Sequence, residues 1–217
     1  MRVVIVASGE PDAADAAWLE QADLVVAADG GAGWVDRMGR RPDLLVGDLD
    51  SADPALVARL ATAGTSIERH PTDKEASDTE LAIEAARSRG ATEILVLGAL
   101  GGDRLDHELA NLLLMADPSL ADPPLRIVRG GTRVRVIRDG GRLELEGDIG
   151  DTVSLLPVGG DAVGMTTTGL RWPLSGSKLR AGRSRGLSNE ILAAPASVSL
   201  ARGALLVVET AREEGIP

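Results

Sequence analysis

Two different patterns in this 217-residue sequence predict an α/β fold, in which a doubly wound, mostly parallel, three-layer domain precedes an all-β sandwich domain. In the first half, short apolar runs alternate with segments of helical periodicity. In the second half, strand-like runs follow one another between glycine-rich turns. Two proline clusters, Asp117-Pro118 and Asp122-Pro123-Pro124, separate the patterns because they cannot continue a helix. We therefore expect domains at residues 1–120 and 125–217.

The elements of the first domain alternate between strand and helix. Its helix starts carry recognisable signals: Asp53 and Pro54 supply an N-cap residue and a first-turn proline, and Ser77 with Glu80 forms a capping box. The expected strands are Val3–Ala7, Leu24–Ala28, Leu44–Val46, Ser66–Arg69 and Glu93–Leu97. The expected helices are Asp12–Gln21, Ala32–Met38, Asp53 to Gly64, Ser77 to Gly90 and Arg104–Ala116.

The second domain is expected to consist of strands and tight turns. Asp139-Gly140-Gly141 and Gly159-Gly160-Asp161 have the residue types of β-hairpin turns. The expected strands are Leu125–Arg129, Arg133–Arg138, Arg142–Glu146, Thr152–Pro157, Val163–Thr168 and Leu205–Glu209. Many short strands with such turns are typical of a sandwich.

Composition excludes several classes of function. The chain has no cysteine and only two histidines, which excludes disulfides, thiolate metal sites and histidine-rich metal sites. Its net charge of −10, with no evident basic face, argues against nucleic-acid binding. The first apolar run is too short for a signal peptide, and no run approaches the roughly 18 residues of a membrane span. We expect a soluble, cytoplasmic protein with no nucleic-acid or membrane partner.

Acidic, glycine-bearing clusters follow four of the expected strands. Because ligands of open α/β sheets bind beyond the carboxyl ends of the strands, these clusters should meet at one edge. Carboxylates gathered there suggest a site for a metal ion that carries a polyphosphate. The clusters are Asp29-Gly30-Gly31, Gly47 to Ser51, Asp73 to Glu80, and Gly101 to Asp106.

The individual residues fit that chemistry to different degrees. Asp48 and Asp50 would project to the same side of an extended backbone, about 6–7 Å apart, and Asp53 already serves as the N-cap, so both are candidate Mg²⁺ ligands. Capping already accounts for Ser77 and Glu80, and the helix dipole accounts for Asp78. Lys74, in contrast, could reach phosphate oxygens as a point charge. Arg104 is placed to bind two phosphate oxygens.

The glycine run that contains Gly101 and Gly102 would let the backbone approach a ligand closely. It matches neither the P-loop pattern nor the dinucleotide-binding pattern, and neither occurs elsewhere in the chain. A P-loop kinase and a dinucleotide-dependent dehydrogenase are therefore not expected.

Taken together, these motifs resemble those of thiamine pyrophosphokinases, in the family's order, over residues 29 to 190. The similar segments are Asp29-Gly30-Gly31-Ala32, Gly47-Asp48-Leu49-Asp50-Ser51, Lys74 to Glu80, Gly101-Gly102 with Arg104 to His107, and Ser188-Asn189. Two departures occur. Lys74-Glu75-Ala76-Ser77-Asp78 stands where the family usually has Lys-Asp-x-Thr-Asp, and Asp103 is inserted before Arg104. Either Asp103 or Asp106 therefore faces the substrate, and we favour Asp106.

The resemblance implies transfer of a diphosphoryl group from ATP to the hydroxyl of thiamine, giving thiamine diphosphate and AMP. It implies an ATP- and Mg²⁺-binding catalytic domain at residues 1–120, a thiamine-binding domain at 125–217, and a homodimer. Asp48 and Asp50 would be the main Mg²⁺ ligands, with Asp29 and Asp78 as further ligands. Gly30, Gly101 and Gly102 would border the nucleotide.

The remaining roles also follow from the resemblance. Lys74 and Arg104 would steady the triphosphate, and Asp78 or Asp106 would orient the thiamine hydroxyl. Ser188 or Asn189 would hydrogen-bond the pyrimidine, and Trp172 would either stack on thiamine or pack between the sheets.

Two other interpretations stay open at this point. A pyrophosphokinase for another hydroxymethyl acceptor, such as a pterin, would share the acidic strand ends but not the pocket around Ser188 and Asn189. The second interpretation is a nucleotide- or thiamine-binding module without catalysis. The acidic residues count against it, because a protein that only binds a polyanion does not need so many carboxylates nearby.

Overall fold

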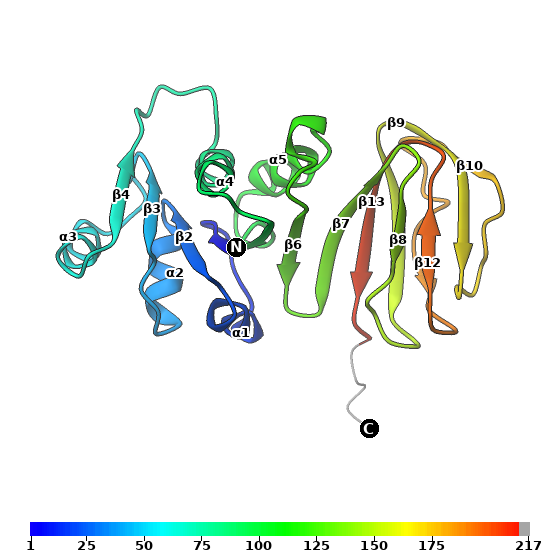
Figure 1. Cartoon of the computed structure of the whole chain (residues 1–217), viewed down its shortest axis with the longest axis horizontal. Coiled ribbons are helices and arrows are strands. Elements are labelled where there is room, and N and C mark those ends of the chain that lie inside the picture. The colour runs from blue at the N-terminus through cyan, green and yellow to red at the C-terminus, as the bar shows by residue number, and fades with distance from the viewer. Residues whose placement is uncertain (213–217) are drawn as a thin grey trace. The chain divides into compact units, whose positions relative to one another are not determined.

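A computed structural model describes residues 1–212, which form a mixed α/β protein (Figure 1). The chain divides into two compact units, the first at Met1–Gly130 and the second from Gly131 onward. The longest helix in the described chain, α4, has 11 residues. None of the helices described there has the length and apolarity that crossing a bilayer requires.

The first unit is built on a sheet whose neighbouring strands all pair in parallel. The strands run in the order β4-β3-β2-β1-β5-β6. The chain therefore proceeds outward from β1 to β4 and then continues on the other side of β1, so the order reverses between β1 and β5. The strands are β1 (Arg2–Val6), β2 (Leu24–Ala28), β3 (Leu44–Gly47), β4 (Ser66–Arg69), β5 (Glu93–Leu97) and β6 (Leu125–Arg129).

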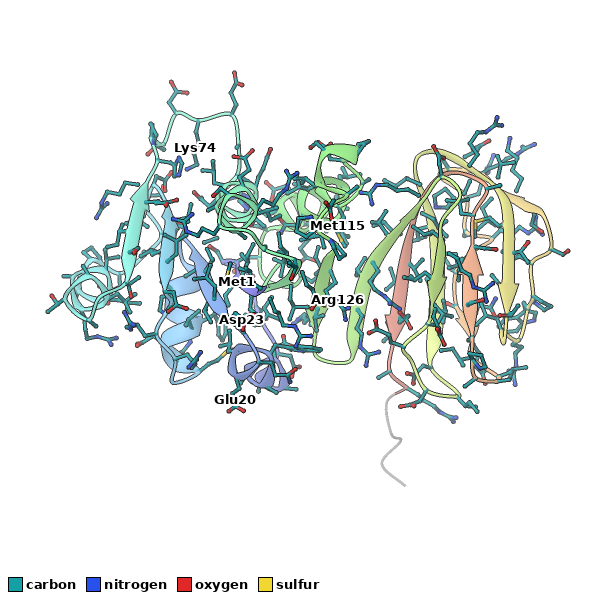
Figure 2. The ribbon with its side chains drawn as sticks, viewed as in Figure 1. Met1, Glu20, Asp23, Lys74, Met115 and Arg126 are labelled. Atoms are coloured by element: carbon teal, nitrogen blue, oxygen red, sulfur yellow. The ribbon has the colours of Figure 1, made fainter. Side chains whose placement is uncertain are left out.

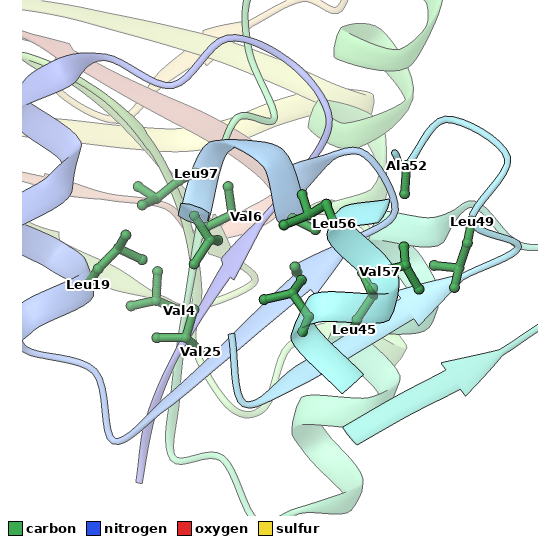
Figure 3. Packing of buried hydrophobic residues seen from close by; sticks show 14 of the residues in the cluster. Val4, Val6, Leu19, Val25, Leu45, Leu49, Ala52, Leu56, Val57 and Leu97 are labelled. Atoms are coloured by element: carbon green, nitrogen blue, oxygen red, sulfur yellow. The ribbon is translucent and has the colours of Figure 1, made fainter. Parts of the chain in front are cut away.

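Helices cover both faces of this sheet (Figure 1). On one face, Leu19 of α1 and Leu56 of α3 pack with strand residues such as Val4 and Leu45 (Figure 3). Val35 of α2 belongs to the same cluster. On the other face, α4 contacts β1, β2 and β3. The helices are α1 (Ala16–Glu20), α2 (Gly31–Arg37), α3 (Pro54–Thr62), α4 (Asp78–Ser88) and α5 (Leu105–Leu114), with short 3₁₀ turns at Ala13–Asp15 and Pro118–Leu120.

The predicted helix starts are confirmed at α3 and α4. Asp53 accepts a hydrogen bond from the Ala55 N–H at 2.9 Å, and Pro54 occupies the first turn. Ser77 Oγ accepts from the Glu80 N–H at 3.2 Å, which is the N-cap half of the predicted capping box. Such caps satisfy backbone donors that have no partner inside the helix. Asp78 consequently begins α4 at a fixed position beside the carboxyl end of β3.

Strand β6 differs from the expected arrangement. We expected Leu125–Arg129 to open the second domain, but β6 pairs in parallel with β5 and belongs to the first unit. Ile127 and Val128 are almost fully buried there. Burial of these two apolar side chains favours the pairing of β6 with the parallel sheet. The proline-rich connection before β6 does not prevent this pairing.

In the second unit, the described regular elements are strands, and all of their pairings are antiparallel. They are β7 (Thr132–Arg138), β8 (Arg142–Glu144), β9 (Thr152–Thr168), β10 (Ser177–Leu179), β11 (Asn189–Glu190), β12 (Ser197–Ser199) and β13 (Arg202–Thr210). The core of this unit gathers residues from several of these strands, including Val153, Leu155, Met165, Val198 and Leu205.

Strand β9 corrects one prediction. Thr152–Pro157 and Val163–Thr168 do not form two strands with a hairpin turn between them, because β9 continues through all 17 residues. Gly159 and Gly160 have positive φ angles, and the register against β13 shifts at the same place. The glycines therefore form a bulge that bends the strand without reversing it. The start of β9 pairs with β13 and its end with β12.

Candidate functional site

A cavity of about 370 Å³ lies at the carboxyl edge of the first unit's sheet, where the strand order reverses. Its walls come from the segments that follow β1, β2, β3 and β5 and from the first turns of α4 and α5. Open α/β sheets bind their ligands at this topological position. The acidic strand ends found in the sequence are therefore brought to one hollow.

Three carboxylates meet in this cavity. Asp29, Asp48 and Asp78 each offer an oxygen, and the three oxygens lie within 4.8 Å of one another. Asp29 directly follows β2 and has a φ of 47°, Asp48 follows β3, and Asp78 begins α4. The three residues come from separate elements, so the fold and not local sequence creates the cluster.

Asp29 is the most buried member, with 4% of its surface exposed. Its Oδ1 is buried and has no hydrogen-bond partner among the described residues. A buried carboxylate oxygen without a partner is costly, and a cation would compensate that cost. Hard carboxylate oxygens are also the ligands that Mg²⁺ prefers, so the residues present fit a divalent ion of this type.

Lys74 lies against the same cluster. Its Nζ is 2.9 Å from Asp48 Oδ2 and 3.0 Å from Asp78 Oδ1, and its side chain is 14% exposed. Figure 2 labels Lys74 on the connection between β4 and α4. The lysine thus pairs with two carboxylates in this structure.

The pairs shift the protonation of the cluster. The hydrogen bond from Lys74 holds the pKa of Asp48 below its ordinary value. Burial acts to lower the pKa of Lys74, but its hydrogen bonds to Asp48 and Asp78 raise it. Burial raises the pKa of Asp29, the hydrogen bond from the Gly30 N–H opposes this rise, and the charge of Asp78 adds to it. Asp29 is therefore the carboxylate whose negative charge is least compensated.

Asp50 lines the cavity without joining the three-carboxylate cluster. The extended backbone expected between Asp48 and Asp50 is not found, because Leu49 has a left-handed φ of 65°. The turn lets the Asp50 N–H donate to Asp48 Oδ1 at 3.2 Å, while Ser51 Oγ donates to Asp50 Oδ1 at 3.0 Å. Asp50 therefore also helps to shape the loop around Asp48.

Gly47 allows the carboxylates to approach one another. A Cβ at this position would lie 2.9 Å from Asp78 Oδ1 and 3.1 Å from Asp29 Cβ, and the φ of Gly47 is 144°. Both the contacts and the backbone conformation exclude a larger residue.

The glycine run after β5 forms the opposite wall of the cavity, with Gly101 and Gly102 among its residues. Asn111, the buried residue of α5, donates from Nδ2 to the Ala99 carbonyl oxygen at 3.0 Å and also lines the cavity. Our sequence analysis missed Asn111. The sequence does hold a signal for this residue, because Asn111 is a polar carboxamide among the leucines of an expected helix.

Arg104 and Asp106 lie at the rim. Arg104 donates from Nε and Nη2 to the two carboxylate oxygens of Asp106, at 2.9 and 2.7 Å, and about two thirds of each side chain is exposed. These hydrogen bonds hold the pKa of Asp106 well below its ordinary value. Arg104 and Asp103 line the cavity, whereas Asp106 is not among its described lining residues.

Gly30 is the N-cap of α2.

The candidate residues of the second unit surround Trp172. Asn189 Oδ1 accepts from the Trp172 N–H at 3.1 Å, and its Nδ2 donates to the Trp172 carbonyl oxygen at 2.8 Å. Trp172 is 57% exposed, so the alternative in which its ring packs between the sheets is wrong. Ser188 has a left-handed φ of 57°, and its N–H donates to Ser154 Oγ.

A separate cavity of about 270 Å³ lies within the second unit. Trp172 and Asn189 line it, together with apolar side chains and Arg185. An exposed aromatic ring beside an apolar hollow with a few polar groups is typical of a small-molecule site. The full lining is Leu155, Trp172, Pro173, Leu174, Arg185, Gly186, Leu187 and Asn189.

Comparison with known proteins identifies relatives for both units. The family model described as the thiamin pyrophosphokinase catalytic domain matches residues 16–127, and the thiamin pyrophosphokinase vitamin B1 binding domain matches residues 142–205. Thiamine pyrophosphokinase 1 of Oryza sativa subsp. japonica is 30% identical over 206 residues, covering 83% of this chain and 76% of that protein. Thiamine pyrophosphokinase of Bacillus subtilis is 25% identical over 165 residues, or 76% of each chain.

A solved structure gives the same result. The crystal structure of thiamin pyrophosphokinase from Geobacillus thermodenitrificans superposes with a TM-score of 0.82 at 26% identity, covering 99% of each chain. Both units, the strand-end motifs and these similarities lead to one conclusion: the chain belongs to the thiamine pyrophosphokinase family.

Proposed function

We propose that the first unit is an ATP- and Mg²⁺-binding catalytic domain and that the second is a thiamine-binding β-sandwich domain. As a family member, the chain is a transferase of thiamine diphosphate biosynthesis. The observation that carries the proposal is the meeting of Asp29, Asp48 and Asp78 in the cavity at the strand-order reversal. The cluster would supply carboxylate ligands for the metal ion that accompanies a polyphosphate substrate.

In the proposed reaction, the hydroxyl oxygen of thiamine forms a bond with the β-phosphorus of ATP. The bond between that phosphorus and the oxygen bridging it to the α-phosphorus breaks, and AMP leaves with this oxygen. The hydroxyl proton passes to a nearby carboxylate or to water. Such transfers depend mainly on positioning and charge neutralisation and little on covalent help from the protein.

Asp29, Asp48 and Asp78 would hold Mg²⁺, with Asp50 beside them. When bound, Mg²⁺ supplies positive charge to the phosphate oxygens. The unpartnered oxygen of Asp29 and the acidic, oxygen-only character of the cluster support this assignment.

The phosphates would lie along the wall formed by Gly101 and Gly102, with Lys74 and Arg104 as their cationic partners. Each of these cations pairs with a carboxylate in this structure, so each must exchange that partner for a phosphate oxygen. The exposed pair between Arg104 and Asp106 can exchange readily, because exposed ion pairs contribute little to stability. For the hydroxyl, we favour Asp78 over Asp106, since Asp78 lines the cavity.

The cavity of the second unit would receive thiamine. Trp172 would offer an exposed ring to the cationic thiazolium, and Asn189 would offer a hydrogen bond. Ser188 is not itself a lining residue, but it stands between the lining residues Leu187 and Asn189. Asn189 already accepts two backbone hydrogen bonds and donates one, so a single Nδ2 hydrogen is left for a ligand.

We also propose that the chain acts as a cytoplasmic homodimer. Leu105, Leu109 and Leu113 are spaced four residues apart on α5 and are each more than half exposed. Exposed apolar rows of this kind are typical of association surfaces. Sedimentation of the purified protein tests the homodimer, which should have twice the mass of the single chain.

The direct test is to incubate the protein with ATP, Mg²⁺ and thiamine and to separate the products. Equal amounts of AMP and thiamine diphosphate are expected, with none after chelation of the metal. AMP that appears only with a pterin alcohol would change the acceptor. ADP alone would contradict the reaction, and absence of AMP even in a single turnover would favour a binding module.

A further inference from the structure

The ammonium of Lys74 lies where the carboxylate cluster most needs positive charge. It is within 3.0 Å of oxygens from two of the three carboxylates, and the side chain is 14% exposed. Asp78 Oδ1, one of these oxygens, is itself buried. Lys74 is not among the lining residues of the cavity, but its contact with Asp48 and Asp78 is largely shielded from solvent. It therefore differs from an exposed ion pair, which would be worth little.

We propose that Lys74 is the resident counter-ion of the cluster and must leave Asp48 and Asp78 before a divalent metal can bind there. The site would then take its metal together with the nucleotide, whose phosphates receive the displaced ammonium. This inference rests on the proposed metal site at Asp29, Asp48 and Asp78.

The first argument concerns space and charge. Mg²⁺ binds its oxygen ligands at about 2.0–2.1 Å, so an ion held by Asp48 and Asp78 would lie close to the oxygens that Lys74 now contacts. Two cations cannot share those oxygens without strong repulsion at short range. With Lys74 in place, the ammonium already compensates Asp48 and Asp78, whereas Asp29 remains uncompensated.

The second argument concerns mobility. Lys74 belongs to the connection between β4 and α4, where residues 71–73 and Glu75 are exposed. Lysine has a compact charge on a flexible four-carbon stem. Its ammonium can therefore change partners by side-chain rotation, while Asp29, Asp48 and Asp78 stay fixed at the ends of their elements.

The arrangement has a measurable consequence for binding. The metal alone must compete with Lys74, whereas the metal with a polyphosphate offers Lys74 a new anionic partner. Metal and nucleotide should therefore strengthen each other's binding, and Lys74 should supply part of that coupling. Removal of the ammonium should tighten binding of the metal alone and weaken the coupling.

The test measures Mn²⁺ binding by electron paramagnetic resonance of free Mn²⁺, without and with α,β-methylene-ATP. Lys74→Met should bind Mn²⁺ alone about 10-fold more tightly than the unchanged protein, the size of effect that removal of one adjacent charge produces. The gain in Mn²⁺ affinity on adding the analogue should shrink. Lys74→Arg keeps the charge, and Arg87→Met removes a charge from the last turn of α4. Both controls should leave Mn²⁺ affinity within about twofold of the unchanged protein.

Thermal unfolding is a second test of the counter-ion role of Lys74. In EDTA, Lys74→Met should melt below the unchanged protein because Asp48 and Asp78 lose their counter-ion. Mg²⁺ should raise the Tm of Lys74→Met by more than it raises the Tm of the unchanged protein. If Lys74→Met proves too unstable to purify, Lys74→Gln serves in its place.

Two results would overturn the inference in distinguishable ways. Equal Mn²⁺ affinity in Lys74→Met and the unchanged protein, at a site lost on Asp29→Asn, would refute the counter-ion role and leave the metal site in place. Mn²⁺ binding by Lys74→Met that is indifferent to Asp29→Asn would refute the metal site itself.

Discussion

The carboxamide of Asn189 binds both the N–H and the carbonyl oxygen of Trp172, so one buried side chain fixes the backbone of an exposed ring. The two residues are 17 positions apart in sequence. An aromatic ring held before a ligand arrives loses less freedom on binding, which favours affinity. Asn189 is thus a support for Trp172 as well as a lining residue of the second unit's cavity.

Asn189→Leu should raise the KM for thiamine about 10-fold and leave the KM for ATP nearly unchanged. It removes hydrogen bonds worth about 1 kcal/mol each and leaves the Trp172 backbone unpaired. Steady-state kinetics with each substrate varied checks this. If Asn189 acts through the ring, Asn189→Leu combined with Trp172→Ala should be no worse than Trp172→Ala alone. Additive losses would contradict that link.

Asp48→Ala should reduce kcat about 100-fold or more, the scale seen when one group that stabilises transition-state charge is removed. The residue follows β3 and contributes little to packing, so the fold should persist. Circular dichroism and the rate of AMP formation are the two measurements. Loss of the folded signal would instead make Asp48 a structural residue.

Gly47→Ala should impair metal binding and destabilise the protein by about 1–3 kcal/mol, because the added methyl group overpacks the carboxylates. Gly160→Ala is a matched control: Gly160 has a comparable φ of 154°, and a Cβ there would meet no described atom within 4 Å. Denaturant unfolding and Mn²⁺ binding of both variants separate crowding of the cluster from backbone strain. Equal effects in the two variants would assign the loss to strain alone.

Asp29→Asn should stabilise the metal-free protein at neutral pH while it abolishes the stabilisation by Mg²⁺. The folded-state pKa of Asp29 is raised above 3.8, so its contribution to stability is fully present below pH 3.8 and is lost as pH rises through the folded value. The variant should therefore gain about 2–4 °C in Tm at pH 7.5, the shift that ~1 kcal/mol gives at this size. Melting curves in EDTA should show the gain shrinking towards pH 4.

Asn111→Leu should raise the KM for ATP about 10-fold with little change for thiamine, because the buried Ala99 carbonyl would lose its donor at a cost of about 1–3 kcal/mol. Ala110→Gln, on an exposed position of the same helix, should leave both KM values unchanged. An equal rise for both substrates would show general damage to the fold and no specific effect on the glycine run.

Much of the first unit could be predicted because its signals are local. Runs of Val, Leu and Ile mark β1, β2 and β5, and the caps at Asp53 and Ser77 mark the helix starts. The convergence of Asp29, Asp48 and Asp78 followed from one rule about parallel strands. Whether each predicted residue performs its assigned role stays a prediction.

The features that could not be predicted depend on tertiary structure. A Gly-Gly-Asp segment fits a hairpin or a bulge equally well, and the pairing of β9 with β13 decides for the bulge. Strands β10, β11 and β12 have two or three residues, too few to show periodicity. The left-handed φ of Leu49 and the contact of Asn111 with Ala99 likewise require the folded chain.

The strand order of the first unit has an evolutionary consequence. Every member of the carboxylate cluster lies before residue 79 and on one side of β1, whereas the glycine run of residues 98–102 lies on the other side. Backbone hydrogen bonds from Ala7 and Gly9 to Leu97 and Gly98 join the two halves, and they tolerate side-chain replacement. Substitutions in one half can therefore alter the proposed nucleotide-binding wall while the geometry of the carboxylate cluster is inherited unchanged in the other.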